Sequence, residues 1–256
     1  MGYSANLGFL FTELALPDRI RAAKAAGFEA VECHFPYDTP AADVAAALAE
    51  TGLKMLSLNT VPGNVAAGDF GLAALAGREA EARAAVEQAV AYAAAIGAAN
   101  VHVMAGKTDG GAEAEATFRA NLAFACDLAA EHGMSVLIEP INHRDVPGYH
   151  LARVEHAADI IAAMGRANLR LMFDCYHSQI MQGDLITRVR DHLALIGHIQ
   201  IAAVPSRAEP DEGEVNYAWL VGAIRGLGYG APIGAEYKPR SGRTSDGLAW
   251  LAALPA

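Results

Sequence analysis

The sequence predicts an α/β protein that folds as a single (β/α)₈ barrel spanning residues 1–256. The chain has 256 residues, about the usual length of eight strand–helix units closed into one barrel. Eight short apolar runs alternate with longer amphipathic segments, and this alternation is typical of parallel βαβ units. No linker, low-complexity segment or break in composition divides the chain, so we expect one domain.

The eight apolar runs have the length of strands and are mostly apolar on both faces. This pattern is typical of strands that are buried in a parallel sheet. The runs are Ala5–Phe11, Ala30–Phe35, Lys54–Thr60, Asn100–Gly106, Ser135–Asn142, Leu169–Cys175, Gly197–Ala203 and Pro232–Tyr237.

Helical segments separate these runs, and most of them end at a glycine just before the next strand. Glycine readily adopts the left-handed conformation that closes a helix. The predicted helices run from Pro17 to Gly27, from Pro40 to Gly52, and over Glu79–Ile96, Ala112–His132, Val154–Met164, Leu185–Ile196, Tyr217–Leu227 and Ser245–Leu254. An open doubly wound sheet is the alternative, but no GxGxxG motif follows the first strand to support a dinucleotide site.

Composition excludes several classes of function. Hydrophobic residues make up 53% of the chain and charged residues 19%, which excludes a disordered or fibrous protein. The net charge of −10 offers no basic face for nucleic acid and disfavours anionic membranes. Charges interrupt each Ala-rich stretch well before the ~20 apolar residues of a membrane span. We therefore expect neither a nucleic-acid nor a membrane partner.

Three cysteines, Cys33, Cys126 and Cys175, are far apart and show no CxxC or zinc-ribbon spacing. An odd number of scattered cysteines favours a reduced, cytoplasmic location, and the N-terminal segment does not have the pattern of a signal peptide. The Ala-rich helical exterior is compatible with a homo-oligomer.

Four acidic or amide side chains interrupt the apolar pattern of the last four predicted strands. Each lies near the carboxyl end of its strand, and burying a charge there without a partner is costly. They are Glu139, Asp174, Gln200 and Glu236, separated by 35, 26 and 36 residues, about one strand–helix unit each time. We therefore expect the four side chains to meet at the mouth of the barrel, where barrel enzymes build their active sites.

Three carboxylates at one point repel one another, and this repulsion raises their pKa values. A divalent cation relieves the repulsion, and oxygen ligands favour Mg²⁺ or Mn²⁺ over Zn²⁺. The sequence therefore predicts that these four residues hold one divalent metal ion. A single acidic residue at a strand end is more often a cap or a salt-bridge partner, so the prediction depends on all four lying at matching depth.

Short motifs along nearly the whole chain resemble those of a known family. They are Phe11-Thr12-Glu13, His34-Phe35-Pro36-Tyr37, Asn59-Thr60-Val61-Pro62-Gly63, Gly77-Arg78-Glu79, Val101-His102-Val103-Met104-Ala105-Gly106, Ile138-Glu139-Pro140-Ile141-Asn142, Phe173-Asp174-Cys175-Tyr176-His177, His198-Ile199-Gln200-Ile201-Ala202, Glu209-Pro210, Gly213-Glu214-Val215-Asn216-Tyr217 and Glu236-Tyr237-Lys238-Pro239. Together, though not singly, these motifs resemble hydroxypyruvate isomerase, within the xylose-isomerase-like TIM barrels.

The resemblance implies an isomerase that interconverts hydroxypyruvate and tartronate semialdehyde through an enediolate. It implies that Glu139 and Glu236 are the catalytic pair that moves the proton, and that both also hold the metal ion with Asp174 and Gln200. Several related ketose epimerases have histidine in place of Gln200, and an amide is a poorer ligand for a transition metal. The sequence does not show which glutamate removes the proton.

Five further residues are candidates for substrate binding. Arg207 follows the seventh strand and is suited to hold a substrate carboxylate in a bidentate contact. Lys238 lies two residues after Glu236 and so shares its strand face. His177, three residues after Asp174, is placed to bond a substrate oxygen. His102 is either a substrate contact or a buried histidine satisfied by a neighbour, and Phe11 is expected to wall the pocket near the mouth of the first strand.

Other functions share this fold. A 2-oxo-tetronate isomerase takes a substrate one carbon longer, and a ketose 3-epimerase uses two glutamates on opposite faces of one carbon. A metal-dependent endonuclease needs several zinc ions, many inward histidines and a basic track, which a chain of net charge −10 does not offer. A non-catalytic sugar- or acid-binding protein is disfavoured by the intact set of four ligand residues.

Overall fold

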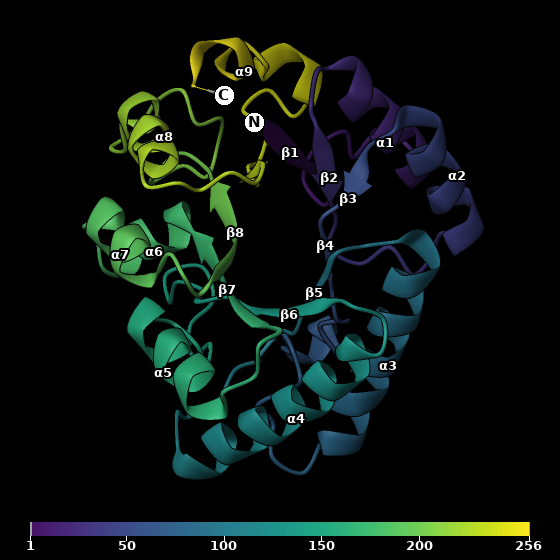
Figure 1. The fold of residues 1–256 in the computed structure, drawn as a ribbon, viewed down its shortest axis with the longest axis vertical. Helices are drawn as coiled ribbons and strands as arrows, with labels where there is room; N and C mark the ends of the chain where they lie inside the picture. The colour runs from purple at the N-terminus through teal and green to yellow at the C-terminus, as the bar shows by residue number, and fades with distance from the viewer. Residues whose placement is uncertain (1, 256) are drawn as a thin grey trace.

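The apolar runs form a ring of parallel strands with the helices outside it (Figure 1). The computed structural model describes residues 2–255. The strands are β1 (Tyr3–Asn6), β2 (Ala30–Glu32), β3 (Lys54–Met55), β4 (Ser57–Asn59), β5 (Asn100–His102), β6 (Ser135–Ile138), β7 (Leu169–Asp174), β8 (Ile196–Ile201) and β9 (Ile233–Ala235).

One predicted strand, split into β3 and β4, closes the ring of strands. The strand order is β3-β2-β1-β9-β8-β7-β6-β5-β4, with every pairing parallel. The two end segments, β3 and β4, are separated only by Leu56, so they are the two parts of one predicted strand. The first part pairs with β2 and the second with β5. The prediction of a (β/α)₈ barrel is thus confirmed.

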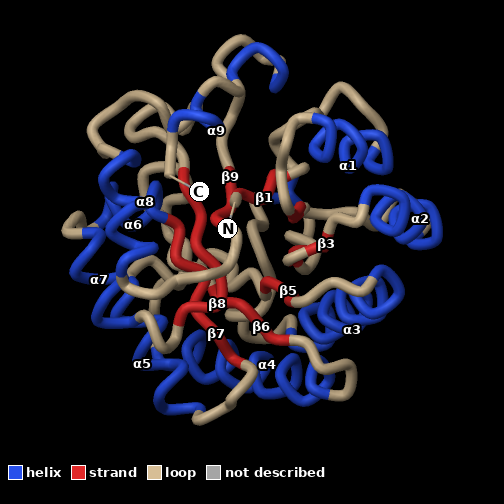
Figure 2. Tube along the Cα trace, turned by 45° about the horizontal axis from the view of Figure 1, so that its top comes forward, coloured by secondary structure: helices blue, strands red, loops and turns tan. Residues whose placement is uncertain are grey.

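The helices cover the outer face of the strands (Figure 2). They are α1 (Leu16–Ala25), α2 (Ala41–Thr51), α3 (Glu79–Ile96), α4 (Ala112–Ala130), α5 (Val154–Met164), α6 (Cys175–Met181), α7 (Leu185–His192), α8 (Tyr217–Gly226) and α9 (Trp250–Ala253), with short 3₁₀ helices η1 (Val65–Ala67) and η2 (Thr244–Gly247). Among the described residues, no helix combines the length and the apolar character needed to cross a membrane.

Helix α3 illustrates how the sequence sets these elements. Val86, Ala89, Val90 and Ala93 recur at helical spacing and are buried. The helix ends at Gly97, whose φ of 69° is left-handed and whose N–H bonds the carbonyl of Ala93. The chain then turns directly into β5, as the repeated glycine before each strand predicts.

Several predicted boundaries differ from the structure by a few residues, and two differences stand out. The first strand ends at Asn6 rather than Phe11, because the Asn6 side chain accepts the N–H of Gly8 and its carbonyl accepts the N–H of Leu10. These bonds bend the chain into a turn. The last predicted helix, Ser245–Leu254, is η2 followed by the short α9.

Candidate active site

The four predicted ligand residues lie together at the carboxyl ends of neighbouring strands. Glu139 follows β6, Asp174 ends β7, Gln200 lies in β8 beside Asp174 in register, and Glu236 follows β9. All four are buried, with 1 to 6% of each residue exposed. Ligand atoms of Glu139, Asp174 and Glu236, together with one ring nitrogen of His177, lie within 4.8 Å of one another. The sequence-based expectation of a shared location therefore agrees with the geometry.

A cavity of about 300 Å³ opens onto two of these four residues, Glu139 and Glu236. Its polar wall carries Glu139, Glu236, His102, His177 and Arg207. The rest of the wall is mostly apolar and includes Phe9, Phe35, Pro62, Val65, Phe70, Met104, Ile141 and Val146. The cavity therefore combines a few charged and polar side chains with a mostly apolar lining, which is common in small-molecule sites.

Glu236 is surrounded by hydrogen-bond donors. Arg207 Nη2 donates to its Oε2 at 2.7 Å, while Asn6 Nδ2 and His34 Nε2 lie 2.9 Å from its Oε1. Burial raises the pKa of Glu236, but the charge of Arg207 and the contact with His34 outweigh burial and hold the pKa well below its usual range. Glu236 is therefore ionised and fixed in place.

Glu139, in contrast to Glu236, is poorly supplied with hydrogen-bond donors. Its Oε1 has no hydrogen-bond partner among the described residues, and its Oε2 lies 3.7 Å from His102 Nδ1. Burial raises its pKa well above the usual value, and the carboxylates of Glu236 and Asp174 raise it further. The pKa values of the two glutamates are thus shifted in opposite directions, although both residues line one cavity.

Asp174 uses only one of its two oxygens. Its Oδ1 accepts the backbone N–H of Tyr176 at 2.6 Å and so caps α6, while its Oδ2 has no partner among the described residues. Burial raises the pKa of Asp174 to about 7, and repulsion from Glu236 adds to this.

Three buried oxygens at the mouth share this lack of a partner within residues 2–255: Glu139 Oε1, Asp174 Oδ2 and Gln200 Oε1. The amide nitrogen of Gln200 donates to Glu32 Oε2 at 3.2 Å, which leaves the carbonyl oxygen free. Buried polar atoms are rarely left unsatisfied, and hard divalent cations prefer such oxygens. These residues therefore fit a cation such as Mg²⁺ or Mn²⁺, whereas both oxygens of Glu236 already have donors.

His177 directs a proton into the same cluster. The backbone N–H of Asn142 donates to its Nδ1, so the proton of the neutral ring lies on Nε2. That nitrogen is 3.7 Å from Asp174 Oδ2 and 3.8 Å from Glu139 Oε1. Burial lowers the pKa of His177 to about 3, and the charge of Arg207 lowers it further. The neutral ring can therefore donate a hydrogen bond from Nε2 to an oxygen atom of a bound ligand.

Arg207 reaches the cavity from the loop after β8 with a left-handed backbone, at φ 57°. Its guanidinium lies 5.0 Å from the ring centres of both Phe9 and Tyr176. The sequence suggested a free clamp for a substrate carboxylate, but in the structure Arg207 already binds Glu236. Its Nε has no partner among the described residues.

The remaining predicted substrate-binding residues have different positions. His102 is buried in the cavity wall, and burial lowers its pKa to about 4. Lys238 is exposed, with its Nζ 5.7 Å above the ring of Phe9. Phe11 does not wall the cavity, because the turn after Asn6 carries it into the core.

The Phe11 ring packs edge-on against Phe28, 6.5 Å away between centroids. Phe9 takes the place in the cavity wall that was expected for Phe11.

His34 contacts Glu236 directly but is not among the site residues that were predicted from the sequence. Its ring stands edge-on to Phe9, and a Cβ on Gly8 would lie only 2.2 Å from its Nδ1. Gly8 therefore makes room for His34. A polar residue just past the end of β2 is the signal that could have identified it, by the same reasoning that identified Glu139.

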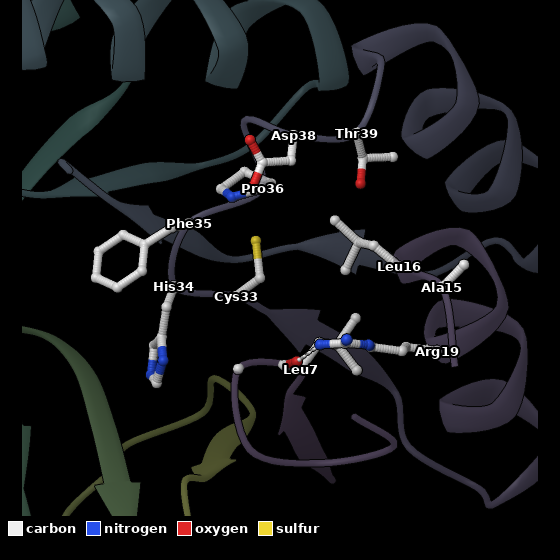
Figure 3. Close-up of a pocket in the computed structure, with 11 residues that line it drawn as sticks. Leu7, Ala15, Leu16, Arg19, Cys33, His34, Phe35, Pro36, Asp38 and Thr39 are labelled. Carbon is white, nitrogen blue, oxygen red and sulfur yellow. Dashed lines mark hydrogen bonds between the residues drawn. The ribbon is translucent and has the colours of Figure 1, made fainter. Parts of the chain in front are cut away.

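A second cavity, also about 300 Å³, shares His34 and Phe35 with the first and is drawn in Figure 3. In Figure 3 the Cys33 thiol and the His34 ring point in opposite directions. Burial raises the pKa of Cys33 to about 12, so the thiol is protonated. Asp38 is the sole carboxylate among its lining residues, so the first cavity is the better candidate for acid–base chemistry.

Comparison with known proteins agrees with this geometry. The family model for the xylose isomerase-like TIM barrel matches residues 20–254. The chain is 49% identical to 2-oxo-tetronate isomerase from Cupriavidus necator, over 97% of this chain and 96% of that protein. It is 39% identical to hydroxypyruvate isomerase from Escherichia coli, over 97% of each chain.

A crystal structure of an AP endonuclease, family 2, from Brucella melitensis superposes with a TM-score of 0.94 at 41% identity, covering 100% of both chains. The expectation of an enzyme of the isomerase class is confirmed at this coarse level by the two relatives above. The family resemblance and the fold are confirmed over nearly the whole length. This chain belongs to the xylose isomerase-like TIM barrel family.

Proposed function

We propose that this protein is an isomerase that moves the carbonyl of a small 2-oxo acid between C2 and C3, with hydroxypyruvate and tartronate semialdehyde as the substrate pair. The observation that carries this proposal is the pair Glu139 and Glu236, two buried carboxyl groups in one cavity with opposite pKa shifts. Such pairs are typical of enzymes in which one group takes a proton and another returns it.

Proton transfer is assigned as follows. Glu236 removes the proton from C3 of hydroxypyruvate, and Glu139 delivers a proton to C2. The hydroxyl proton on O3 passes to O2, so that O3 becomes the carbonyl oxygen of the product. In the free protein Arg207 makes Glu236 a weak base. A substrate carboxylate that binds Arg207 loosens the contact between Arg207 and Glu236, which makes Glu236 a stronger base. Substrate binding and base activation are thereby coupled through one guanidinium group.

Other residues hold the substrate during this transfer. His177 donates from Nε2 to a substrate oxygen, and this hydrogen bond stabilises the charge that develops in the enediolate. Lys238 at the rim attracts the substrate carboxylate, and His102 contacts the substrate from the cavity wall. The apolar side chains around the opening exclude water from the reacting carbons.

We further propose a divalent cofactor, Mg²⁺ or Mn²⁺, held by Glu139, Asp174 and Gln200, with Glu236 close to it. The three unpartnered oxygens support this assignment. Such an ion supplies Lewis-acid stabilisation of the developing negative charge. Glu139 would serve both purposes, with its unpartnered Oε1 as the ligand atom and its Oε2 left for proton transfer.

The second candidate function is isomerisation of 2-oxo-tetronate, which needs the same chemistry at C2 and C3 and room for one more carbon. The relative from Cupriavidus necator bears that name at 49% identity, and a cavity of about 300 Å³ has room for either acid. A ketose 3-epimerase is a weaker candidate because Gln200 stands where related epimerases have histidine.

We propose a cytoplasmic location and a homo-oligomeric state for this enzyme. The net charge of −10 argues against a nucleic-acid substrate, although one solved relative is named an AP endonuclease. Retention of a DNA oligonucleotide at low salt would contradict this part of the proposal.

The test is an assay of hydroxypyruvate, 2-oxo-tetronate and a ketose side by side, with chelator and after adding back Mg²⁺ or Mn²⁺. We expect turnover of at least one 2-oxo acid, lost in chelator and restored by either ion. Turnover of the ketose alone would contradict the proposed substrate class. Full activity in chelator would contradict the metal assignment but not the proposed roles of Glu139 and Glu236 as acid and base.

A further inference from the structure

A second group of potential metal ligands lies outside the barrel mouth. Glu115 is in the first turn of α4, His150 is in the loop after β6, and His156 is in α5. Nε2 of each histidine lies 3.0 Å from the same oxygen, Oε2 of Glu115. The three ligand atoms lie within 4.8 Å of one another, and none of these residues lines the candidate active-site cavity.

We propose that Glu115, His150 and His156 form a Zn²⁺ site, which cross-links the loop after β6 to α4 and α5. Two imidazole nitrogens, one carboxylate oxygen and a water molecule make a typical zinc ligand set. Zn–N bonds of about 2.05 Å place neighbouring ligand atoms of a tetrahedron about 3.3 Å apart. The observed 3.0 Å contacts therefore need to open by only a few tenths of an ångström to hold the ion between them.

Supporting contacts orient these ligands. Thr108 Oγ1 lies 2.8 Å from His150 Nδ1, which leaves Nε2 facing Glu115. Arg119 Nε donates to the other carboxylate oxygen, Oε1, and leaves Oε2 for the histidines. Partners of this kind fix the orientation of metal ligands in zinc proteins. The charge of Arg119 weakens the attraction for a cation, so we expect looser binding than in an all-neutral setting.

The burial of the three ligands suits a metal that enters from solvent. The His150 side chain is 1% exposed, whereas those of Glu115 and His156 are 25% and 36% exposed. The buried histidine is fixed by its surroundings, and the edge of the Phe118 ring packs against it. The two more exposed ligands leave space for water as the fourth ligand.

Zinc binding at this site would restrain a loop that also contributes to the mouth of the barrel. The same loop carries Asn142, which holds His177 by its backbone N–H, and Val146, which lines the cavity. A metal ion at His150 fixes the far end of this loop to two helices. We therefore expect Zn²⁺ to slow amide hydrogen exchange in residues 142–150.

The experiment must separate this site from the one at the mouth. In a variant that combines Glu139→Gln and Asp174→Asn, two carboxylates at the mouth become neutral amides, which weakens cation binding there. This protein is freed of metal with chelator and titrated with Zn²⁺ alone by calorimetry, and bound zinc is counted after gel filtration. We expect one zinc ion per chain and a higher melting temperature with zinc.

Adding His156→Ala or Glu115→Gln should weaken zinc binding by about tenfold or more. His132→Ala, which removes an exposed histidine just after α4, is the matched control and should leave binding unchanged. His156 lies on the surface of α5, so its loss should spare the fold, which circular dichroism checks.

Two results would overturn the proposal: no zinc bound by the double variant, or equal binding after His156→Ala. An anomalous zinc peak between the three residues in crystals of the double variant would support it. Because bound zinc is counted directly, neither result depends on the proposed isomerase activity.

Discussion

The buried carboxyl groups at the barrel mouth should make the metal-free protein less stable as the pH rises from 5 to 8. Asp174 is central to this effect, since burial and repulsion from Glu236 raise its pKa to about 7. In the unfolded chain its pKa is near the ordinary aspartate value of 3.8. Because the folded pKa is the higher one, this contribution is full below about pH 4 and is lost as the pH rises through about 7.

The size of the effect follows from the difference between the two pKa values. A shift from 3.8 to about 7 corresponds to about 4 kcal/mol of folding free energy, shared with the neighbouring Glu139. Roughly 2 kcal/mol of this falls between pH 5 and pH 7. Asp174→Asn removes the titrating group but keeps an oxygen that can cap α6. The variant should therefore lose much less stability over this pH range.

The assay is urea unfolding at pH 5 and pH 8 in chelator, on the wild type and Asp174→Asn. Asp159→Asn, which changes an exposed aspartate on α5, is the control and should follow the wild type. Adding Mg²⁺ or Mn²⁺ at pH 8 should raise the stability of the wild type far more than that of Asp174→Asn. An equal pH dependence in wild type and Asp174→Asn would refute the reasoning.

Three further predictions concern the cavity. Glu139→Gln should lower kcat by about 10²–10⁴-fold with little change in KM, measured by steady-state kinetics; catalysis that survives this change would contradict the assignment. Gly8→Ala should lower kcat while circular dichroism stays native, because the new Cβ would lie 2.2 Å from His34 Nδ1 and displace it; unchanged kcat would mean that His34 has no role. Phe9→Ala should raise KM without much loss of stability, whereas Phe11→Ala should cost about 3–5 kcal/mol in urea unfolding. The reverse pattern would contradict their placement.

The sequence was informative about the barrel because its signals are local and repeated. A glycine such as Gly97 closes a helix, and an apolar run follows it, so the order of elements could be predicted without tertiary information. The split of the third strand around Leu56 could not, since it reflects pairing with two different neighbours. The turn at Asn6 depends on side-chain hydrogen bonds that no hydrophobic pattern reports.

The candidate site could be predicted in part for a similar reason. Glu139, Asp174 and Glu236 stand out as charges at the ends of apolar strands, and strand spacing places them together. The partners of these charges come from distant parts of the chain. His34 and Arg207 both contact Glu236, and only the closed barrel brings them near each other. Sequence spacing therefore shows where charges gather but not which donor each one binds.

The most direct test of the proposed proton transfer is to run the reaction with hydroxypyruvate in D₂O and follow C2 of the product by NMR, with an enzyme-free control. If Glu236 removes the C3 proton and Glu139 supplies a different one, tartronate semialdehyde should carry deuterium from the solvent at C2. The Glu139→Gln variant should form product about 10²–10⁴-fold more slowly. Product that contains only substrate hydrogen at C2 would contradict transfer between two carboxyl groups.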